Sequence, residues 1–290
     1  MIRKGIILAA GTGSRLSPIT KSVNKQLLPI YNKPLIFYPL SVFLQNKIKD
    51  ILIIVNKDQL KQFKKILPEK NNLGIKITYM IQIRPKGLPD AFLLAKKFIN
   101  NESVALILGD NIFLTKSKSK FFFNSSDIFS GAEIFTYPVK QPKQYGVAKI
   151  DRNKRVIHIE EKPIKPKSNL AITGLYLFDN EVIKLSHKLK PSKRNETEIV
   201  DLIKYYQKKR KLNHIKLGRG AIWSDAGKID DFTNISNFVT SVEKVQGLKI
   251  ACLDEIAYKK NWIKKDQLIK NINFYGNCPY SDYLKKILKK

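Results

Sequence analysis

A glycine-rich turn near the start of the chain carries residues that could bind a triphosphate. It reads Ala9-Ala10-Gly11-Thr12-Gly13-Ser14-Arg15 and directly follows a short apolar run that ends at Leu8. Two glycines let the backbone approach an anion, and successive N–H groups of a turn form an anion-binding concavity. Arg15, and Lys25 ten residues later, would add positive charge at two depths along a phosphate chain. The spacing fits neither a Walker A loop nor the dinucleotide fingerprint.

An aspartate after the most apolar run could hold a divalent cation. Asp110 follows residues 104–108 within Gly109-Asp110-Asn111. At the end of a strand its carboxylate would lie over a nucleotide, where Mg²⁺ could bridge it to phosphate oxygens. An ordinary helix N-cap or Asx turn is the alternative for the same residue.

The segment from Lys4 to Leu40 resembles the signature of the sugar-phosphate nucleotidylyltransferases, above all in Lys25-Gln26-Leu27-Leu28-Pro29 and the residues after it. Similar blocks recur to about Tyr258, and the similarity is greatest to members that join dTTP to glucose 1-phosphate. The resemblance implies an enzyme that forms dTDP-glucose and pyrophosphate, and so feeds dTDP-rhamnose and deoxysugar synthesis. It also implies a homotetramer that uses Mg²⁺, held by Asp110 and Asp225.

The resemblance assigns further residues to the sugar phosphate. These residues are Tyr145, Gly146, Glu161, Lys162, Tyr176 and Arg194. Without the resemblance, Glu161 and Lys162 could form a plain surface ion pair, and Tyr176 could belong to the core.

Nucleotide contacts are expected from the turn and from three later segments. The predicted set is Leu8, Gly11, Gly13, Ser14, Gln26, Gln82, Gly87 and Asp110. A glutamine amide offers both a donor and an acceptor to the edge of thymine or uracil, so Gln26 and Gln82 are expected to select the base. Gly87 would let the backbone approach the base. None of these residues separates thymine from uracil.

Arg15 and Lys25 are the predicted catalytic residues. A phosphate monoester is mostly dianionic near neutral pH, with a second pKa of about 6, so its oxygen needs no general base. The histidines lie outside every motif: His158, His187 and His214. We therefore expect in-line attack on the α-phosphorus, opposite the departing pyrophosphate, with Lys162 and Arg194 holding the nucleophile.

The elements that must position these residues follow an α/β pattern. Short apolar runs predict strands at 6–8, 51–55, 75–81 and 104–108. Amphipathic stretches predict helices at 34–46, 59–67 and 88–99. Right-handed crossovers would place these helices on both faces of a mixed, mainly parallel, Rossmann-like sheet, with ligands at the carboxyl ends of its strands.

The second half of the chain has shorter alternating segments, which predict an antiparallel, sugar-binding elaboration of the sheet. These segments lie at 132–139, 147–150, 156–161 and 171–178. Helical patterns follow at 232–243 and 281–290. The predicted organisation is a nucleotidyltransferase core at 1–231, with a nucleotide-binding part at about 1–130 and a sugar-binding part at about 131–231. A helical extension at 232–290 would pack on this core.

Composition bounds the remaining possibilities. No stretch of the 290 residues approaches the ~20 apolar residues of a membrane span, so we expect a cytoplasmic protein with no membrane insertion. The net charge of +30 is almost all lysine, without interleaved aromatic residues, which favours a solvated surface over nucleic-acid binding. Polyanion binding that weakens steeply with salt is the alternative. Cys252 and Cys278 have no zinc or disulfide spacing.

Several residues depart from the family pattern. Ala10 replaces a glycine, Asp90 a neutral glutamine and Ala226 a threonine. At the family's secondary, inhibitory nucleotide site, Leu114-Thr115-Lys116 replaces Tyr-Gly-His, although Glu255 and Ile256 remain. Two alternatives stay open. One is a UTP-dependent or other sugar-1-phosphate uridylyltransferase, and the other is a non-catalytic nucleotide-binding homologue.

Overall fold

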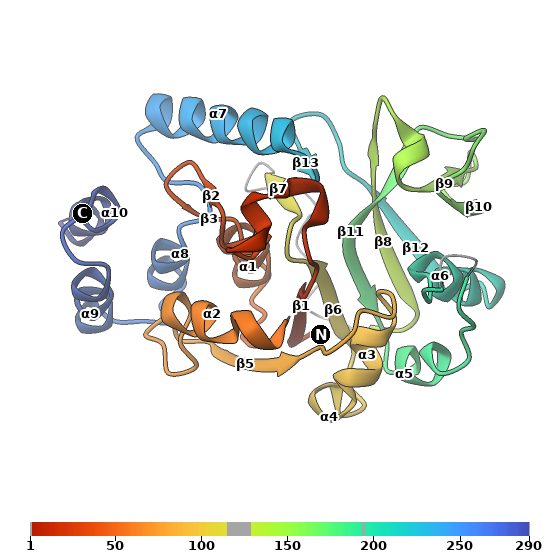
Figure 1. Ribbon diagram of the computed structural model, residues 1–290, viewed down its shortest axis with the longest axis horizontal. Helices are drawn as coiled ribbons and strands as arrows, with labels where there is room; N and C mark the ends of the chain where they lie inside the picture. Colours follow the sequence, from red (N-terminus) through yellow and green to blue (C-terminus); the bar gives the residue numbers. More distant parts are fainter. Residues whose placement is uncertain (1, 115–128, 193–194, 290) are drawn as a thin grey trace.

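Nine strands of the described residues form one mixed β-sheet through the centre of the molecule (Figure 1). The computed structural model describes residues 2–114, 129–192 and 195–289. The strands of this sheet are β1 (Lys4–Ala9), β4 (Asp50–Val55), β5 (Lys76–Ile81), β6 (Val104–Leu108), β8 (Ala132–Pro138), β9 (Gly146–Ile150), β10 (Val156–Glu161), β11 (Leu170–Phe178) and β12 (Leu212–Lys216). Their order is β10-β9-β11-β6-β1-β4-β5, with β8 paired to β11 and β12 paired to β8.

The half of the sheet formed by β6, β1, β4 and β5 is parallel, as predicted. The inner strands β6, β1 and β4 are nearly continuous apolar runs because both faces are covered. Ile7 packs into the cluster on one face and Ile6 into the cluster on the other. The connecting helices are α1 (Phe37–Gln45), α2 (Leu60–Ile66), α3 (Asp90–Leu94) and α4 (Lys96–Ile99). The single helix predicted at 88–99 is two helices, since the backbone leaves the helical conformation at Ala95.

The other half confirms the predicted antiparallel elaboration. β11 runs antiparallel to β6, with Leu175 opposite Ile107, and also pairs antiparallel with β8 and β9. The sequence analysis did not predict β12, nor the helices α5 (Glu181–Ser186) and α6 (Ile199–Lys208) that cover this half. Apolar residues of α6 such as Val200 and Tyr206 are buried in the same cluster as Ile6.

Two short pairings hold the segments that carry motifs. β7 (Ile112–Leu114) pairs with β13 (Ile222–Ser224), and β2 (Pro29–Ile30) pairs with β3 (Lys33–Pro34). The last helices are α7 (Ile229–Gln246), α8 (Leu253–Lys259), α9 (Lys265–Tyr275) and α10 (Pro279–Leu288). α7 lies across the top of the molecule in Figure 1, and α9 and α10 lie at its left edge. The predicted boundary between core and extension falls inside α7, and this division stays a prediction.

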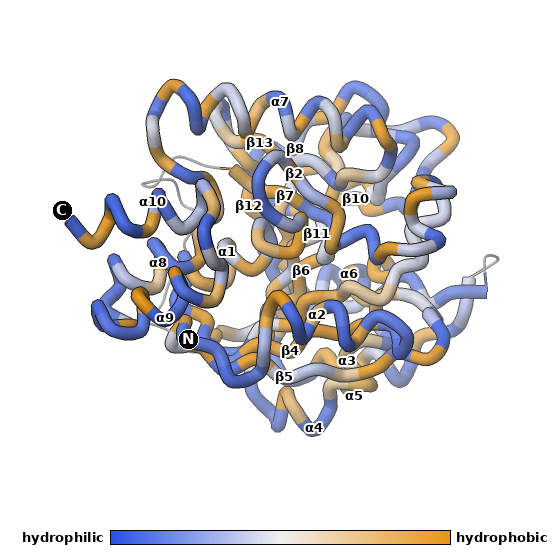
Figure 2. Tube along the Cα trace, turned by 60° about the vertical axis from the view of Figure 1, so that its left-hand side comes forward, coloured by the Kyte–Doolittle hydropathy of each residue, from blue (hydrophilic) through white to orange (hydrophobic). Residues whose placement is uncertain are grey.

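Apolar and polar residues are mixed along α7 and α10, as the changes between orange and blue in Figure 2 show. The apolar residues recur every three or four positions, so each helix has one apolar face. This accounts for the burial of Ile235 and Val239 of α7 and Leu284 of α10. None of the helices in the described ranges is both long enough and apolar enough to cross a membrane.

Candidate active site

The glycine-rich turn leaves the carboxyl end of β1 and closes into a short 3₁₀ helix, Ser14–Leu16. Gly13 has a φ of 64°, and its carbonyl accepts hydrogen bonds from Leu16 N and Thr20 Oγ1, both at 2.8 Å. A Cβ at Gly13 would lie 2.9 Å from the Thr20 side chain, whereas one at Gly11 would meet nothing within 4 Å. Gly13 therefore shapes the turn, and Gly11 leaves open space beside it.

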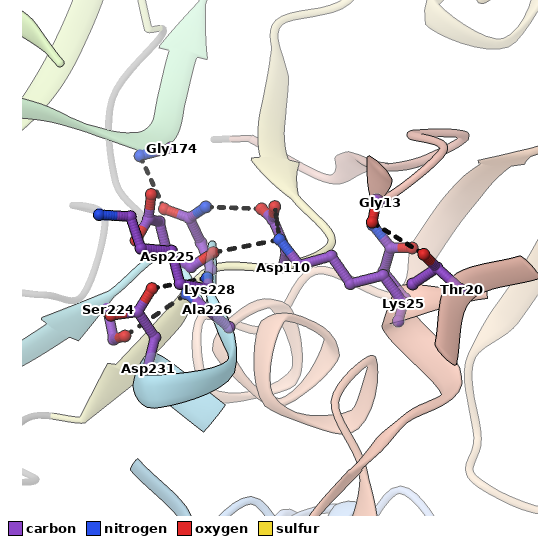
Figure 3. A network of polar contacts seen from close by, with 12 residues as sticks. Gly13, Thr20, Lys25, Asp110, Gly174, Ser224, Asp225, Ala226, Lys228 and Asp231 are labelled. Carbon is purple, nitrogen blue, oxygen red and sulfur yellow. Dashed lines mark hydrogen bonds and ion pairs between the residues drawn. The ribbon is translucent and has the colours of Figure 1, made fainter. Parts of the chain in front are cut away.

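Lys25 reaches Asp110 across the ends of two neighbouring strands. Asn24 caps the turn of Lys25: its Oδ1 accepts from Gln26 N at 2.8 Å, and its Nδ2 donates to Ala9 O at 3.2 Å. Asp110 follows β6, which pairs with β1. The Lys25 Nζ lies 2.7 Å from Asp110 Oδ2, the contact at the centre of Figure 3. The sheet thus brings together the two charges that the sequence analysis placed in separate motifs.

Asp225 joins this site through the pairing of β7 with β13. Asp110 lies just before β7 and Asp225 just after β13, and Lys25 Nζ is 3.5 Å from the Asp225 carbonyl oxygen. Burial, followed by the negative charges of Asp110 and Asp231, raises the pKa of the Asp225 carboxyl, against the opposing charges of Lys25 and Arg15. The pKa of Asp225 therefore depends on the charges of Asp110, Asp231, Lys25 and Arg15.

Arg15 completes the cluster. A Cβ at Gly227 would lie 3.3 Å from Arg15 Nη1 and 3.2 Å from Asp225 Oδ2. Gly227 thus leaves room for the guanidinium beside the carboxylate. The predicted catalytic pair and the predicted metal ligands lie in one place.

Asn111 has a role that the sequence analysis missed. It is almost fully buried, and its Nδ2 donates to Asp110 Oδ1 at 2.8 Å. Its Oδ1 accepts from Gly174 N at 3.1 Å and from Trp223 Nε1 at 2.7 Å. Asn111 therefore ties Asp110 both to β11 and to the strand that leads to Asp225. Its place in the Gly109-Asp110-Asn111 motif was the available signal.

The two carboxylates fit a divalent cation whose shell the substrates complete. Asp110 and Asp225 offer hard oxygen atoms. Burial, and then repulsion from Asp110 and Asp231, raises the pKa of Asp225, and a dication would relieve that repulsion. In the part of the chain that the structure describes, no three His, Cys, Asp or Glu side chains gather as a metal site. Phosphate oxygens and water would have to supply the other ligands.

The residues predicted to read the base lie at the ends of β1 and β5. Gln82 is buried, and its Nε2 donates to Asp90 Oδ2 at 2.9 Å. Gln26 is also buried, and its Oε1 has no partner within the described residues, so a donor on a ligand could satisfy it. A Cβ at Gly109 would lie 3.0 Å from both Gln26 Cγ and Leu8 O, which places Leu8 beside Gln26.

Gly87 also allows a close approach between two segments of the chain. Its φ is 110°, and a Cβ there would lie 2.0 Å from the carbonyl oxygen of Thr197. The two residues form a parallel bridge, and Thr197 N donates to Lys86 O at 2.8 Å. The close approach is therefore to another segment of the chain, and contact of Gly87 with a base stays a prediction.

The residues assigned to the sugar line the neighbouring strands β9 and β10. A Cβ at Gly146 would lie 3.0 Å from Glu161 Oε2, and Lys162 N donates to Tyr145 O at 3.0 Å. Burial, helped by the charge of Asp225 and a hydrogen bond with it, raises the pKa of Tyr145 to about 12. Tyr145 thus links this side to the carboxylates.

Two predicted sugar residues need separate mention. Tyr176 is 4% exposed and stacks on Phe178 at 6.2 Å between ring centroids, as a core side chain would. Burial raises its pKa well above the ordinary value, with a contribution from the Glu161 charge. Contact of Tyr176 with a sugar stays a prediction. Arg194 lies outside the described residues.

Glu255 and Ile256, which the resemblance relates to a secondary nucleotide site, line a cavity of about 800 Å³ together with Leu114 and residues of α7. A nucleotide at this cavity stays a prediction. Thr115 and Lys116 lie outside the described residues.

Comparison with known proteins places the chain in a class. Residues 4–242 match the nucleotidyl transferase family. A glucose-1-phosphate thymidylyltransferase of Neisseria meningitidis is 43% identical over 99% of this chain and 100% of its own. One of Mycobacterium tuberculosis is 39% identical over 99% of each chain. The chain therefore belongs to the nucleotidyl transferase family.

Solved structures confirm the predicted fold. A Bacillus anthracis protein assigned as a glucose-1-phosphate thymidylyltransferase, in complex with sucrose, is 36% identical and has a TM-score of 0.71, covering 81% of this chain and 94% of its own. A UDP-glucose pyrophosphorylase complexed with UDP-glucose shares the fold at 24% identity, with a TM-score of 0.72 over 83% of this chain and 99% of its own. The predicted resemblance is confirmed, and the chain is a nucleotidyltransferase.

Proposed function

We propose that this enzyme condenses dTTP with α-D-glucose 1-phosphate to give dTDP-glucose and pyrophosphate, and that it serves dTDP-rhamnose or related deoxysugar synthesis. The convergence of Arg15, Lys25, Asp110 and Asp225 at one edge of the sheet carries the proposal. The curated relatives named for this reaction cover the whole chain and support the choice of substrates. By the same relationship, we propose a homotetramer.

The chemistry requires positioning and charge neutralisation rather than proton transfer. An oxygen of the sugar phosphate bonds to the α-phosphorus as the bond from that phosphorus to the bridging oxygen breaks, and pyrophosphate leaves with the electron pair. Arg15 and Lys25 neutralise the charge on the departing group, and the open backbone at Gly11 admits the phosphates. Lys162 and Arg194 hold the nucleophile. Such positioning contributes about 7–11 kcal/mol.

Asp110 and Asp225 would hold a divalent cation, for which we propose Mg²⁺. When bound, it would polarise phosphoryl oxygens as a Lewis acid. In the structure, Lys25 Nζ pairs with Asp110 Oδ2, one of the oxygen atoms that would be offered to such a cation.

Pyrophosphate release from glucose 1-phosphate and Mg²⁺, with dTTP and UTP in parallel, tests the proposal. We expect release with dTTP that the Asp110→Asn variant loses. A preference for UTP would keep the mechanism and change the product to UDP-glucose. Binding of nucleotide without any release, by folded protein, would instead favour the non-catalytic homologue.

A further inference from the structure

The hydrogen-bond partner of the Gln82 side-chain amide fixes the orientation of its oxygen and nitrogen atoms. Gln82 is 4% exposed at the end of β5, and its backbone N donates to Val55 O at 3.0 Å. Its Nε2 donates to Asp90 Oδ2 at 2.9 Å. A carboxylate accepts hydrogen bonds and donates none, so only the nitrogen of the amide can face Asp90. Among the described residues, no donor is bonded to the Gln82 oxygen.

The orientation matters because the two orientations of an amide match different pyrimidine bases. With its nitrogen partly used by Asp90, Gln82 presents its oxygen and one remaining N–H. Thymine and uracil offer a ring N–H donor beside a carbonyl acceptor, which this arrangement matches. Cytosine offers a ring nitrogen acceptor beside an amino donor, which would match only the flipped amide.

We propose that Asp90 is a specificity-determining positioning residue, which fixes the Gln82 amide so that the site accepts thymine or uracil and rejects cytosine. The inference rests on the proposed function only in taking Gln82 as the reader of the base. The neutral glutamine usual at this position could donate or accept, and would leave the amide free to turn. In this chain a charged, acceptor-only side chain removes that freedom.

The test compares wild type, Asp90→Asn and Asp90→Gln with dTTP and dCTP at saturating glucose 1-phosphate. Both variants keep a polar partner but allow either amide orientation. We expect the ratio of kcat/KM for dTTP over dCTP to fall about tenfold, mostly through a gain with dCTP, because the flipped amide no longer turns its oxygen toward a carboxylate that can only accept. The KM for glucose 1-phosphate should not change. Asp58→Asn, which removes an exposed carboxylate after β4, is the charge-matched control.

Parallel losses with both nucleotides, or an unchanged ratio, would overturn the proposal, since a merely structural role affects both substrates alike. Calorimetric binding of dTTP and dCTP to the same proteins gives the answer independently of turnover. If wild type binds dTTP in preference to dCTP without releasing pyrophosphate, the proposed reaction fails. The role of Asp90 is then tested by whether the binding preference for dTTP falls in the Asp90 variants. If wild type shows no preference in binding, Gln82 does not read the base and the proposal fails.

Discussion

Two lysines eight residues apart in the sequence, Lys25 and Lys33, form carboxylate pairs of similar length in very different surroundings. The Nζ–O distances are 2.7 Å for Lys25–Asp110 and 2.8 Å for Lys33–Glu243. The Asp110 side chain is 25% exposed, whereas that of Glu243 is 5% exposed. Asn32 Nδ2 and Ile250 N also donate to Glu243.

The difference teaches what distinguishes a reactive pair from a structural one. Glu243 joins the β2–β3 hairpin to α7 and the segment after it, and its oxygens are already satisfied. Burial acts to raise the pKa of Glu243, but the Lys33 hydrogen bond and charge hold it below the ordinary value. At the other pair, burial and then the negative charges of Asp110 and Asp231 raise the pKa of the neighbouring Asp225. The proposed site thus keeps Asp110 partly exposed and leaves its negative charges incompletely compensated.

The same substitution in both pairs should separate the two roles most strongly in activity. Lys25→Met should lower kcat by about 10³-fold or more, because the charge on the departing pyrophosphate loses its partner. Its free energy of unfolding should change by less than about 1.5 kcal/mol, since Asp110 remains partly solvated. Steady-state pyrophosphate release and denaturant unfolding measure both. A large loss of unfolding free energy with kcat little changed would contradict the assignment of Lys25 to the reaction.

The buried pair should show the reverse pattern. Lys33→Met should cost about 3 kcal/mol of unfolding free energy, because Glu243 keeps a charge in the interior without its main partner. The kcat of the folded protein should stay within a few-fold of wild type. Lys64→Met, in the exposed pair with Glu69 at 3.3 Å, is the control and should cost under about 1 kcal/mol. Equal losses for the buried and exposed variants would remove the distinction.

A smaller effect should come from the side chain that holds Asp110. Asn111→Asp keeps the acceptor for Gly174 and Trp223 but replaces the donor to Asp110 with a second carboxylate oxygen. Because Asp110 loses its hydrogen bond and meets a like charge, we expect kcat to fall about 10- to 100-fold. The concentration of Mg²⁺ needed for half-maximal rate should change as well. Trp223→Phe removes only the Nε1 donor and should lower kcat less than tenfold. A larger effect of Trp223→Phe would mean that Asn111 acts through packing alone.

The smallest effect concerns pH. Asp225 must be ionised to bind a cation, and its raised pKa places the loss of activity with falling pH above the range of an ordinary aspartate. Asp231→Asn removes a negative neighbour, lowers the pKa of Asp225 and should move this acid limb toward lower pH. The Asp231 side chain accepts from Lys228 N at the start of α7, a contact an amide oxygen can keep. A shift toward higher pH would contradict the assigned repulsion.

The sequence predicted most of the parallel half because continuous apolar runs and glycine turns are local signals. It placed Asp110 and the turn at strand ends correctly, and parallel topology then brought them together. It did not predict the hydrogen bonds of Asn111 or the bridge from Gly87 to Thr197, since these depend on contacts with residues 63 and 110 positions away. It also missed β12, whose residues do not alternate between buried and exposed because the strand lies at the edge of the sheet.

The bridge between Gly87 and Thr197 joins the loop after Gln82 to the segment that leads into α6. One segment belongs to the predicted base-reading part and the other follows Arg194. Because this bridge ties the two segments together, a substitution that moves the loop after Gln82 is expected to move the start of α6 with it.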